Sequence, residues 1–329
     1  MKKILLIGGA GYVGTSMMKE YITNNKISKI NCLDRLIYIK QKFDNKIFNT
    51  KKIKFIKGDF RNLKIIKKSL LNMTDVIILG GLVGDPITKR YRKLSYSINY
   101  LGIKKLLNFL SKEKSINKVI FVSTCSNYGI VKNKLADENT KLLPKSAYAK
   151  AKVDIEKYIL KHKKMKPCPV ILRFSTAFGQ APRMRYDLTI NEFCKYASND
   201  EQLIVYDPET WRPYCHVKDF SRIVLKVLNS PNKIVRNQVF NVGSNSSNFR
   251  KKDIVKLIKK EKKNLKVTFL KKKVDPRDYR VNFLKLKKTL NISPNYSAKM
   301  GIKEMIKNLN LKKKISQDIG NYKIKKNVK

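Results

Sequence analysis

Apolar-rich runs alternate with amphipathic stretches along the first half of the chain. The runs lie at residues 4–7, 29–33, 53–56, 74–79, 118–123 and 169–174. Between them, apolar residues recur at helical spacing from residue 12 onward and at 63–72, 95–112 and 146–164. This alternation of strand and helix predicts an α/β fold of Rossmann type, with a doubly wound parallel sheet covered by helices on both faces.

The pattern loses its regularity after residue 174. Glycines and prolines separate short elements, which we expect to be helices at 187–198, 217–228, 251–259 and 298–309 and strands at 238–241 and 266–270. The chain therefore divides into a Rossmann domain at 1–174 and a smaller α+β region at 175–310 that shapes a substrate pocket. Residues 311–329 are rich in lysine and poor in apolar residues, which predicts a frayed basic tail.

The charge and the cysteine content indicate which partners and which cellular compartment the sequence favours. The formal net charge of +50 comes from 74 basic and 24 acidic residues, and the lysines are spread over nearly every surface segment. We interpret this as a solvated basic surface rather than a nucleic-acid patch, although such a field attracts an anionic substrate such as a diphosphate. Five scattered cysteines and the lack of a long apolar run predict a cytoplasmic protein without a membrane partner. With only two histidines, no metal site is expected.

Three glycines follow the first predicted strand at a spacing typical of phosphate-binding turns. Gly8 permits the sharp turn, Gly11 lets the backbone approach a pyrophosphate, and Gly14 lets the following helix lie close to the strand. Asp34 ends the second strand, where a carboxylate accepts ribose hydroxyls. It favours NAD over NADP because a carboxylate repels a 2′-phosphate, although Arg35 beside it could receive that phosphate.

A tyrosine and a lysine four residues apart stand one element after a strand that ends in hydroxyl residues. Tyr148 and Lys152 share one face of a helix that Ser146 caps, and Thr124 ends the fifth strand. The lysine charge lowers the free energy of ionising the phenol, so Tyr148 can act as a base toward a sugar hydroxyl. Thr124 would hydrogen-bond the same substrate oxygen. The alternative is a surface pair, because this lysine-rich chain matches the spacing elsewhere.

These motifs resemble a known enzyme family. They are Gly8-x-x-Gly11-x-x-Gly14, Asp34, Gly58-Asp59, Asn99, Thr124, Tyr148-x-x-x-Lys152 and the run from Arg212 to Asp219, RPYCHVKD. Together they are similar to those of the extended short-chain dehydrogenase/reductase family, which contains the NAD-dependent nucleotide-sugar epimerases and dehydratases. The resemblance covers about residues 1–309.

The resemblance implies NAD as cofactor, a nucleotide-diphosphate sugar as substrate and a homodimer formed through the helices at 95–112 and 146–164. It assigns the catalytic roles to Thr124, Tyr148 and Lys152. The cofactor would contact Gly8, Gly11, Tyr12, Val13, Gly14, Asp34, Asp59, Phe60, Leu79, Gly80, Gly81, Asn99 and Lys152. The substrate would contact Thr176, Arg183, Arg212 and Arg277, with Arg185 as an alternative to Arg183.

Three functions remain open at this point. The first is an epimerase that oxidises a sugar hydroxyl transiently, expected at C4, with Tyr148 as base. The second is an NAD(P)H-dependent nucleotide-diphospho-4-keto-6-deoxysugar reductase that uses the same residues. The third is a noncatalytic nucleotide-sensing or RNA-binding relative. A dehydratase is not expected, because Cys125 and Ser126 stand where dehydratases carry an acid and a base. The family also implies a role in building surface polysaccharide.

Overall fold

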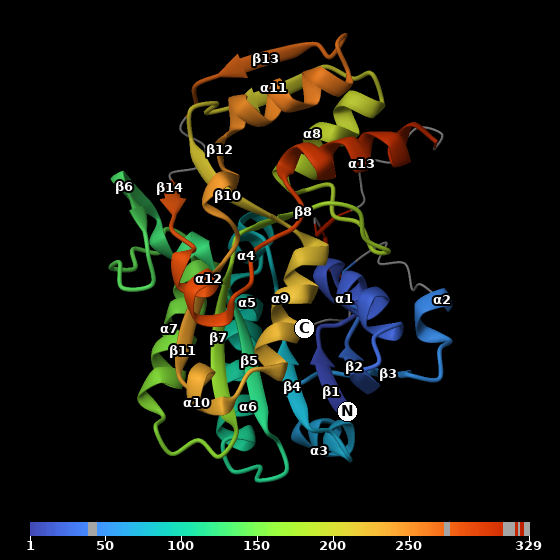
Figure 1. Ribbon diagram of the computed structural model, residues 1–329, viewed down its shortest axis with the longest axis vertical. Helices are drawn as coiled ribbons and strands as arrows, with labels where there is room; N and C mark the ends of the chain where they lie inside the picture. Colours follow the sequence, from blue (N-terminus) through green and yellow to red (C-terminus); the bar gives the residue numbers. More distant parts are fainter. Residues whose placement is uncertain (39–44, 273–276, 312–319, 322, 326–329) are drawn as a thin grey trace.

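A seven-stranded parallel sheet forms the centre of the protein (Figure 1). The computed structural model describes residues 1–38, 45–272, 277–311, 320, 321 and 323–325. The strands are β1 (Lys2–Ile7), β2 (Ile27–Asp34), β3 (Ile53–Lys57), β4 (Asp75–Ile78), β5 (Lys118–Thr124), β7 (Cys168–Phe174) and β11 (Gln238–Val242). Their order across the sheet is β11-β7-β5-β4-β1-β2-β3. The predicted fold class is confirmed.

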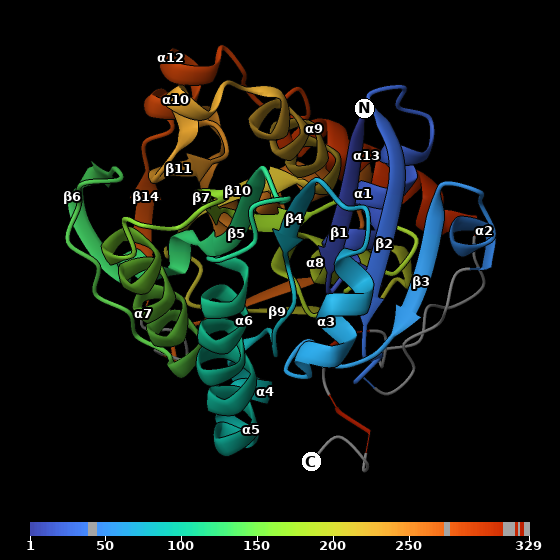
Figure 2. The ribbon, with the colours of Figure 1, turned by 90° about the horizontal axis from the view of Figure 1, so that it is seen from below.

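Alternate residues of the strands face opposite layers of helices. Ile4 and Leu6 of β1 pack with α1 (Tyr12–Ile22), α9 (Val217–Asn229), α10 (Asn232–Val235) and α12 (Leu284–Leu290). Leu5 and Ile7 pack on the other face with α3 (Leu63–Leu70), α6 (Ile103–Leu110) and α7 (Ala147–Lys161). Figure 2 shows α6 and α7 on one side of the strands and α9, α10 and α12 on the other. The near-continuous apolar runs follow from this burial on both faces.

The helix predicted at 95–112 is not uniform. It consists of α5 (Arg92–Tyr96), a π-helical turn at Ser97–Gly102, and α6. Apolar periodicity did not reveal the wide turn, which places the side chain of Asn99 against the loop after β4. The short helix α4 (Asp85–Arg90) was also not predicted.

The smaller region lies at one end of the sheet, at the top of Figure 1. It contains the mixed sheet of β8 (Thr176–Phe178), β10 (Trp211–His216) and β12 (Asn248–Arg250), and the pair β9 (Leu203–Tyr206) and β13 (Val267–Leu270). Its main helices are α8 (Thr189–Ser198), α11 (Lys251–Glu261) and α13 (Ala298–Asn310). The sequence boundary at 174 does not separate the layers cleanly, because β11 returns to the central sheet beside β7. The unpredicted strands β6 (Ile130–Ala136) and β14 (Asp278–Val281) pair with each other.

The described C-terminal residues contradict the expectation of a frayed tail. Asn321 is buried, and Ile324 forms an antiparallel bridge with Tyr38. Residues 312–319, 322 and 326–329 of the predicted tail lie outside the described residues. Within the described part of the chain, no helix is both long enough and apolar enough to cross a membrane.

Candidate active site

A cavity of about 1100 Å³ opens at the carboxyl ends of the central strands. Its lining joins the glycine loop after β1, the residues after β2, β4 and β5, the start of α7 and several residues of the smaller region. Of the predicted cofactor and catalytic residues, all but Asn99 line this one cavity. Ligand pockets of open parallel sheets form in this position, beyond the carboxyl ends of the strands.

The glycine loop leaves space that a side chain would fill. Gly8 has a φ of +80°, and a Cβ built on it would lie 2.5 Å from the Cα of Gly80. A Cβ on Gly14 would lie 2.3 Å from the carbonyl oxygen of Gly9, so Gly14 lets α1 lie close to the turn that follows β1. Gly11 is the N-cap of α1. The loop and the N-terminus of α1 therefore fit a dinucleotide diphosphate.

The carboxylates after β2 and β3 shape the adenosine end of the cavity. Asp34 accepts hydrogen bonds from the backbone N–H of Ala10 and of Leu36, and burial raises the pKa of its carboxyl group. Arg35 donates to Asp59 at 2.8 Å. Burial raises the pKa of Asp59, but the hydrogen bonds and charge of Arg61, together with Arg35, bring it below its ordinary value. Arg35 is thus directed to Asp59, which supports the preference for NAD.

Tyr148 and Lys152 face the cavity from the first turns of α7. Ser146 caps this helix by accepting a hydrogen bond from the Ala149 N–H. The Nζ of Lys152 lies 5.8 Å from the centre of the Tyr148 ring and donates to the carbonyl of Val122 at 2.7 Å. Burial lowers the pKa of Lys152 to about 8, and the charge of Glu156 opposes this shift. Lys152 therefore stays mainly charged at neutral pH.

Thr124 lies at the end of β5, beside the same part of the cavity. Its Oγ1 accepts a hydrogen bond from the Ser126 N–H at 3.1 Å and lies 2.9 Å from the Ser126 hydroxyl. Both hydroxyls line the cavity, so Ser126 is a candidate that the sequence analysis did not select. Cys125 between them is buried, and burial raises the pKa of its thiol.

Asn99 does not line the cavity, contrary to its assignment as a cofactor contact. Its amide accepts from the Leu82 N–H at 2.8 Å and donates to the Leu82 carbonyl at 2.9 Å and to Ser95 at 3.1 Å. Asn99 therefore holds the glycine-rich loop after β4 in place. Asn99 therefore affects the shape of the cavity through this loop, without lining the cavity itself.

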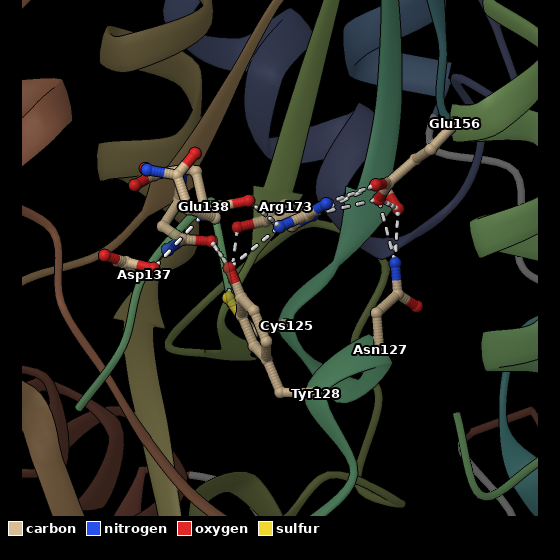
Figure 3. A network of polar contacts seen from close by, with 10 residues as sticks. Cys125, Asn127, Tyr128, Asp137, Glu138, Glu156 and Arg173 are labelled. Atoms are coloured by element: carbon tan, nitrogen blue, oxygen red, sulfur yellow. Dashed lines mark hydrogen bonds and ion pairs between the residues drawn. The ribbon is translucent and has the colours of Figure 1, made fainter. Parts of the chain in front are cut away.

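A buried polar network extends from Glu156 and Arg173 to Asn127 and Tyr128 (Figure 3). Arg173 of β7 forms an ion pair with Glu156 of α7, with 2.7 Å between Nη2 and Oε2, and also donates to the hydroxyl of Tyr128. Glu156 accepts further hydrogen bonds from Ser123 and Asn127. The network thus ties α7 to β5, β7 and the turn after β5. The sequence analysis missed Glu156, although its position eight residues after Tyr148 places it on the same helix face.

Three of the predicted substrate residues line the outer part of the cavity. They are Thr176 at the start of β8, Arg212 of β10 and Arg277 just before β14. The Arg212 guanidinium lies 5.3 Å from the centre of the Tyr279 ring and donates to the carbonyl of Trp211. Lys145 and Lys251 also line the cavity and were not predicted. This end of the cavity is therefore basic and suits an anionic substrate.

Arg183 and Arg185 also line the cavity, next to residues of its cofactor end. The Arg183 N–H donates to the hydroxyl of Thr15 in α1, and its guanidinium lies 5.2 Å from the centre of the Tyr38 ring. Arg185 forms an ion pair with Asp187 at 2.5 Å. Arg183 lines the cavity, and its contact with the substrate stays a prediction. Tyr38 and Asp187 are cavity residues that carry no recognisable motif.

The described residues contain no group of three or more histidine, cysteine or acidic side chains placed to hold a metal ion. His216 is fully buried and stacks on Tyr296, so it is a packing residue of this region.

The chain is similar to known proteins both in sequence and in fold. The chain is 29% identical over 248 residues to the uncharacterized UDP-glucose epimerase YtcB of Bacillus subtilis. The aligned region covers 73% of this chain and 76% of the relative. A putative UDP-glucose 4-epimerase of Methanocaldococcus jannaschii is 26% identical over 263 residues, covering 75% and 83%. The fold matches the crystal structure of a UDP-glucuronic acid 4-epimerase from Bacillus cereus in complex with UDP-glucuronic acid and NAD. That match has a TM-score of 0.82 and 23% identity, and it covers 94% of this chain and 99% of that one.

The model of the NAD dependent epimerase/dehydratase family matches residues 4–243, well over half of the chain. The family's cofactor, NAD, agrees with the glycine loop and with Asp34, and the resemblance to extended short-chain dehydrogenases/reductases is confirmed. The protein therefore belongs to the NAD dependent epimerase/dehydratase family, as an enzyme of the extended short-chain dehydrogenase/reductase type.

Proposed function

We propose that the protein is an NAD-dependent nucleotide-sugar epimerase that inverts C4 of a UDP-linked sugar. The observation that carries this proposal is the position of Tyr148, Lys152 and Thr124 on the wall of one cavity whose opposite end has the dinucleotide loop. The relatives support the reaction and the nucleotide, since several are named as UDP-sugar epimerases. The basic outer end of the cavity supports a diphosphate-bearing substrate.

The residues of this chain supply proton transfer and electrostatic stabilisation. Bound NAD supplies a hydride acceptor during oxidation and the corresponding hydride donor during reduction. Tyr148 takes the proton of the sugar hydroxyl as its oxygen becomes a carbonyl, and it returns a proton when the alcohol forms again, so the enzyme ends each cycle unchanged. Lys152 stabilises the phenolate with its charge, and Thr124 donates a hydrogen bond to the reacting oxygen.

The neighbours of Thr124 disfavour dehydration. Removing water from a sugar requires an acid and a base beside the reacting carbons, and this chain has Cys125 and Ser126 next to Thr124. Cys125 points away into the core, where its thiol donates to the carbonyl of Arg173. The reductase alternative keeps the same catalytic residues. An NADPH-dependent version is disfavoured by Asp34 and by the pairing of Arg35 with Asp59.

A homodimer and a cytoplasmic location complete the proposal. Tyr96, Leu101 and Leu160 are exposed apolar side chains on α5, the π-helical turn and α7, the helices through which dimerisation is expected. All five cysteines are free thiols, which suits a reducing compartment. A monomeric mass by light scattering at micromolar concentration would contradict the dimer. The family suggests that the product serves surface polysaccharide synthesis.

The experiment is a product assay with UDP-glucose and UDP-glucuronic acid, without added nicotinamide nucleotide. The proposal predicts conversion to the C4 epimer, detected by NMR, and its loss in Tyr148→Phe. Tyr158→Phe is a matched control because Tyr158 lies on the same helix away from the cavity. Turnover that needs stoichiometric NADH or NADPH and a keto sugar would favour the reductase instead.

A further inference from the structure

The described C-terminal residues contact the cofactor end of the cavity. Asn321, 7% exposed, is itself part of the cavity lining. Its side-chain oxygen accepts from Nη2 of Arg183 at 2.7 Å, and its Nδ2 donates to the carbonyl of Val83 at 3.2 Å. Its backbone N–H donates to Asp187 at 3.3 Å. One residue therefore joins the loop after β4 to the loop after β8.

Ile324 attaches the same segment to a third loop. It forms an antiparallel bridge with Tyr38, and the N–H of Lys325 donates to the carbonyl of Ile37 at 2.9 Å. The Ile324 side chain packs on a small apolar cluster that contains Tyr38, Leu82 and Ile87. The residues after β2, β4 and β8 are thus connected by a segment that follows the last helix of the fold.

The surroundings of the Arg183 side chain indicate which ligand group this segment acts on. Its side chain is buried, and among the described residues it makes no ion pair with a carboxylate. Its guanidinium donates a hydrogen bond to the neutral amide oxygen of Asn321, and its backbone N–H donates to Thr15 near the N-terminus of α1. The charges of Asp187 and Asp34 favour the charged guanidinium, but burial and the neighbouring Arg185 bring its pKa below the ordinary value, so an additional anion bound beside it is favourable. The diphosphate of a dinucleotide in the glycine loop is such an anion.

We propose that Asn321 and residues 323–325 complete the cofactor pocket, with Asn321 positioning Arg183 for the cofactor diphosphate and these residues slowing release of the dinucleotide. Asn321 is suited to this because it holds the guanidinium without neutralising its charge. The inference concerns cofactor retention and goes beyond the proposed reaction. It rests on the cofactor site alone and does not depend on which sugar reacts.

The test measures release of NADH. The full chain is loaded with NADH and mixed with excess NAD⁺, and the loss of NADH fluorescence gives the release rate. A chain that ends after residue 319 and the variant Asn321→Ala should each release NADH about tenfold faster or more, as expected from losing a hydrogen bond to a charged group. Asn310→Ala, at the exposed end of α13, should release it at the rate of the full chain.

A competition titration separates positioning from a general loss of structure. Asn321→Ala should weaken binding of ADP, which carries the diphosphate, and leave binding of adenosine unchanged. Asn321→Asp should also weaken ADP binding, because its carboxylate keeps Arg183 in place but neutralises it. Equal weakening of ADP and adenosine would overturn the positioning role.

Equal NADH release rates for the full chain and Asn321→Ala would overturn the inference. If the shortened chain does not fold, Asn321→Ala decides the outcome alone. Failure of the full chain to bind NADH would overturn the cofactor assignment and this inference together. Tight NADH binding without any sugar turnover would refute only the proposed function.

Discussion

The ion pair between Glu156 and Arg173 should be essential to both stability and the pH dependence of catalysis. Their side chains are 2% and 4% exposed, and Arg173 donates to Glu156 through both Nε and Nη2. Replacing Glu156 by glutamine keeps the shape but leaves a buried guanidinium without its counter-ion. Breaking a buried pair in this way costs about 3–5 kcal/mol.

This loss of unfolding free energy can be expressed as a decrease in melting temperature. With an unfolding entropy of about 2.1 cal/mol/K per residue, a chain of 329 residues loses roughly 1.4 °C for each kcal/mol. Glu156→Gln and Arg173→Met should therefore each lower Tm by about 4–7 °C. The double variant should lose less than the sum, because neither charge is then left unpaired. Lys262→Met, which removes an exposed pair with Asp200, should have almost no effect.

Glu156 also acts on the catalytic lysine one turn away. Its charge raises the pKa of Lys152 against the effect of burial, so Glu156→Gln should lower that pKa below about 8. Since charged Lys152 is the active form, the alkaline limb of kcat should move to lower pH. Differential scanning fluorimetry and a pH profile of turnover measure both effects. Single variants that each change Tm by less than 1 °C and add up in the double variant would refute the reasoning.

Three further outcomes are expected. Tyr148→Phe should lower turnover by about 10²–10⁴-fold while NAD content and Tm stay unchanged, and a variant that retains full turnover would exclude Tyr148 as the base. Gly8→Val should abolish NADH binding in a fluorescence titration, because the positive φ of Gly8 and the nearby Gly80 leave no space for a side chain; normal affinity would contradict the glycine-loop assignment. Burial lowers the pKa of Lys152 from 10.5 to about 8 in the folded protein. Between these pH values the unfolded chain therefore binds more protons than the folded chain. The contribution of Lys152 to the free energy of unfolding should thus increase with pH across that window. Comparing denaturant midpoints of the wild-type chain and Lys152→Met at pH 8 and pH 10 tests this, since the variant should lack that component.

The elements of the central sheet could be predicted because their signals are local. Residues 4–7 form an uninterrupted apolar run because they are buried on both faces, and Gly8 and Gly14 after them occupy positions where a Cβ would clash. Tyr148 and Lys152 share a helix face by their spacing alone. These features need no knowledge of distant residues.

The features that could not be predicted depend on contacts between residues far apart in the sequence. The pairing of β6 with β14 joins residues more than 140 positions apart, and the exposed, lysine-bearing β6 lacks the alternation of a half-buried strand. The role of Asn99 depends on a wide helical turn that leaves no mark in apolar periodicity. Asn321 stands in a lysine-rich stretch whose composition predicts fraying, and only its partners Arg183, Asp187 and Val83 explain why it is buried.

The most direct test of the central claim is epimerisation in D₂O without added nicotinamide nucleotide. Hydride transfer at C4, with Tyr148 handling only the hydroxyl proton, predicts that UDP-sugar and its C4 epimer interconvert while C4 retains its original hydrogen. NMR of the isolated product should therefore show no deuterium at C4. Deuterium at C4 would mean that a carbon-bound proton is exchanged with solvent, and it would contradict the transient-oxidation mechanism.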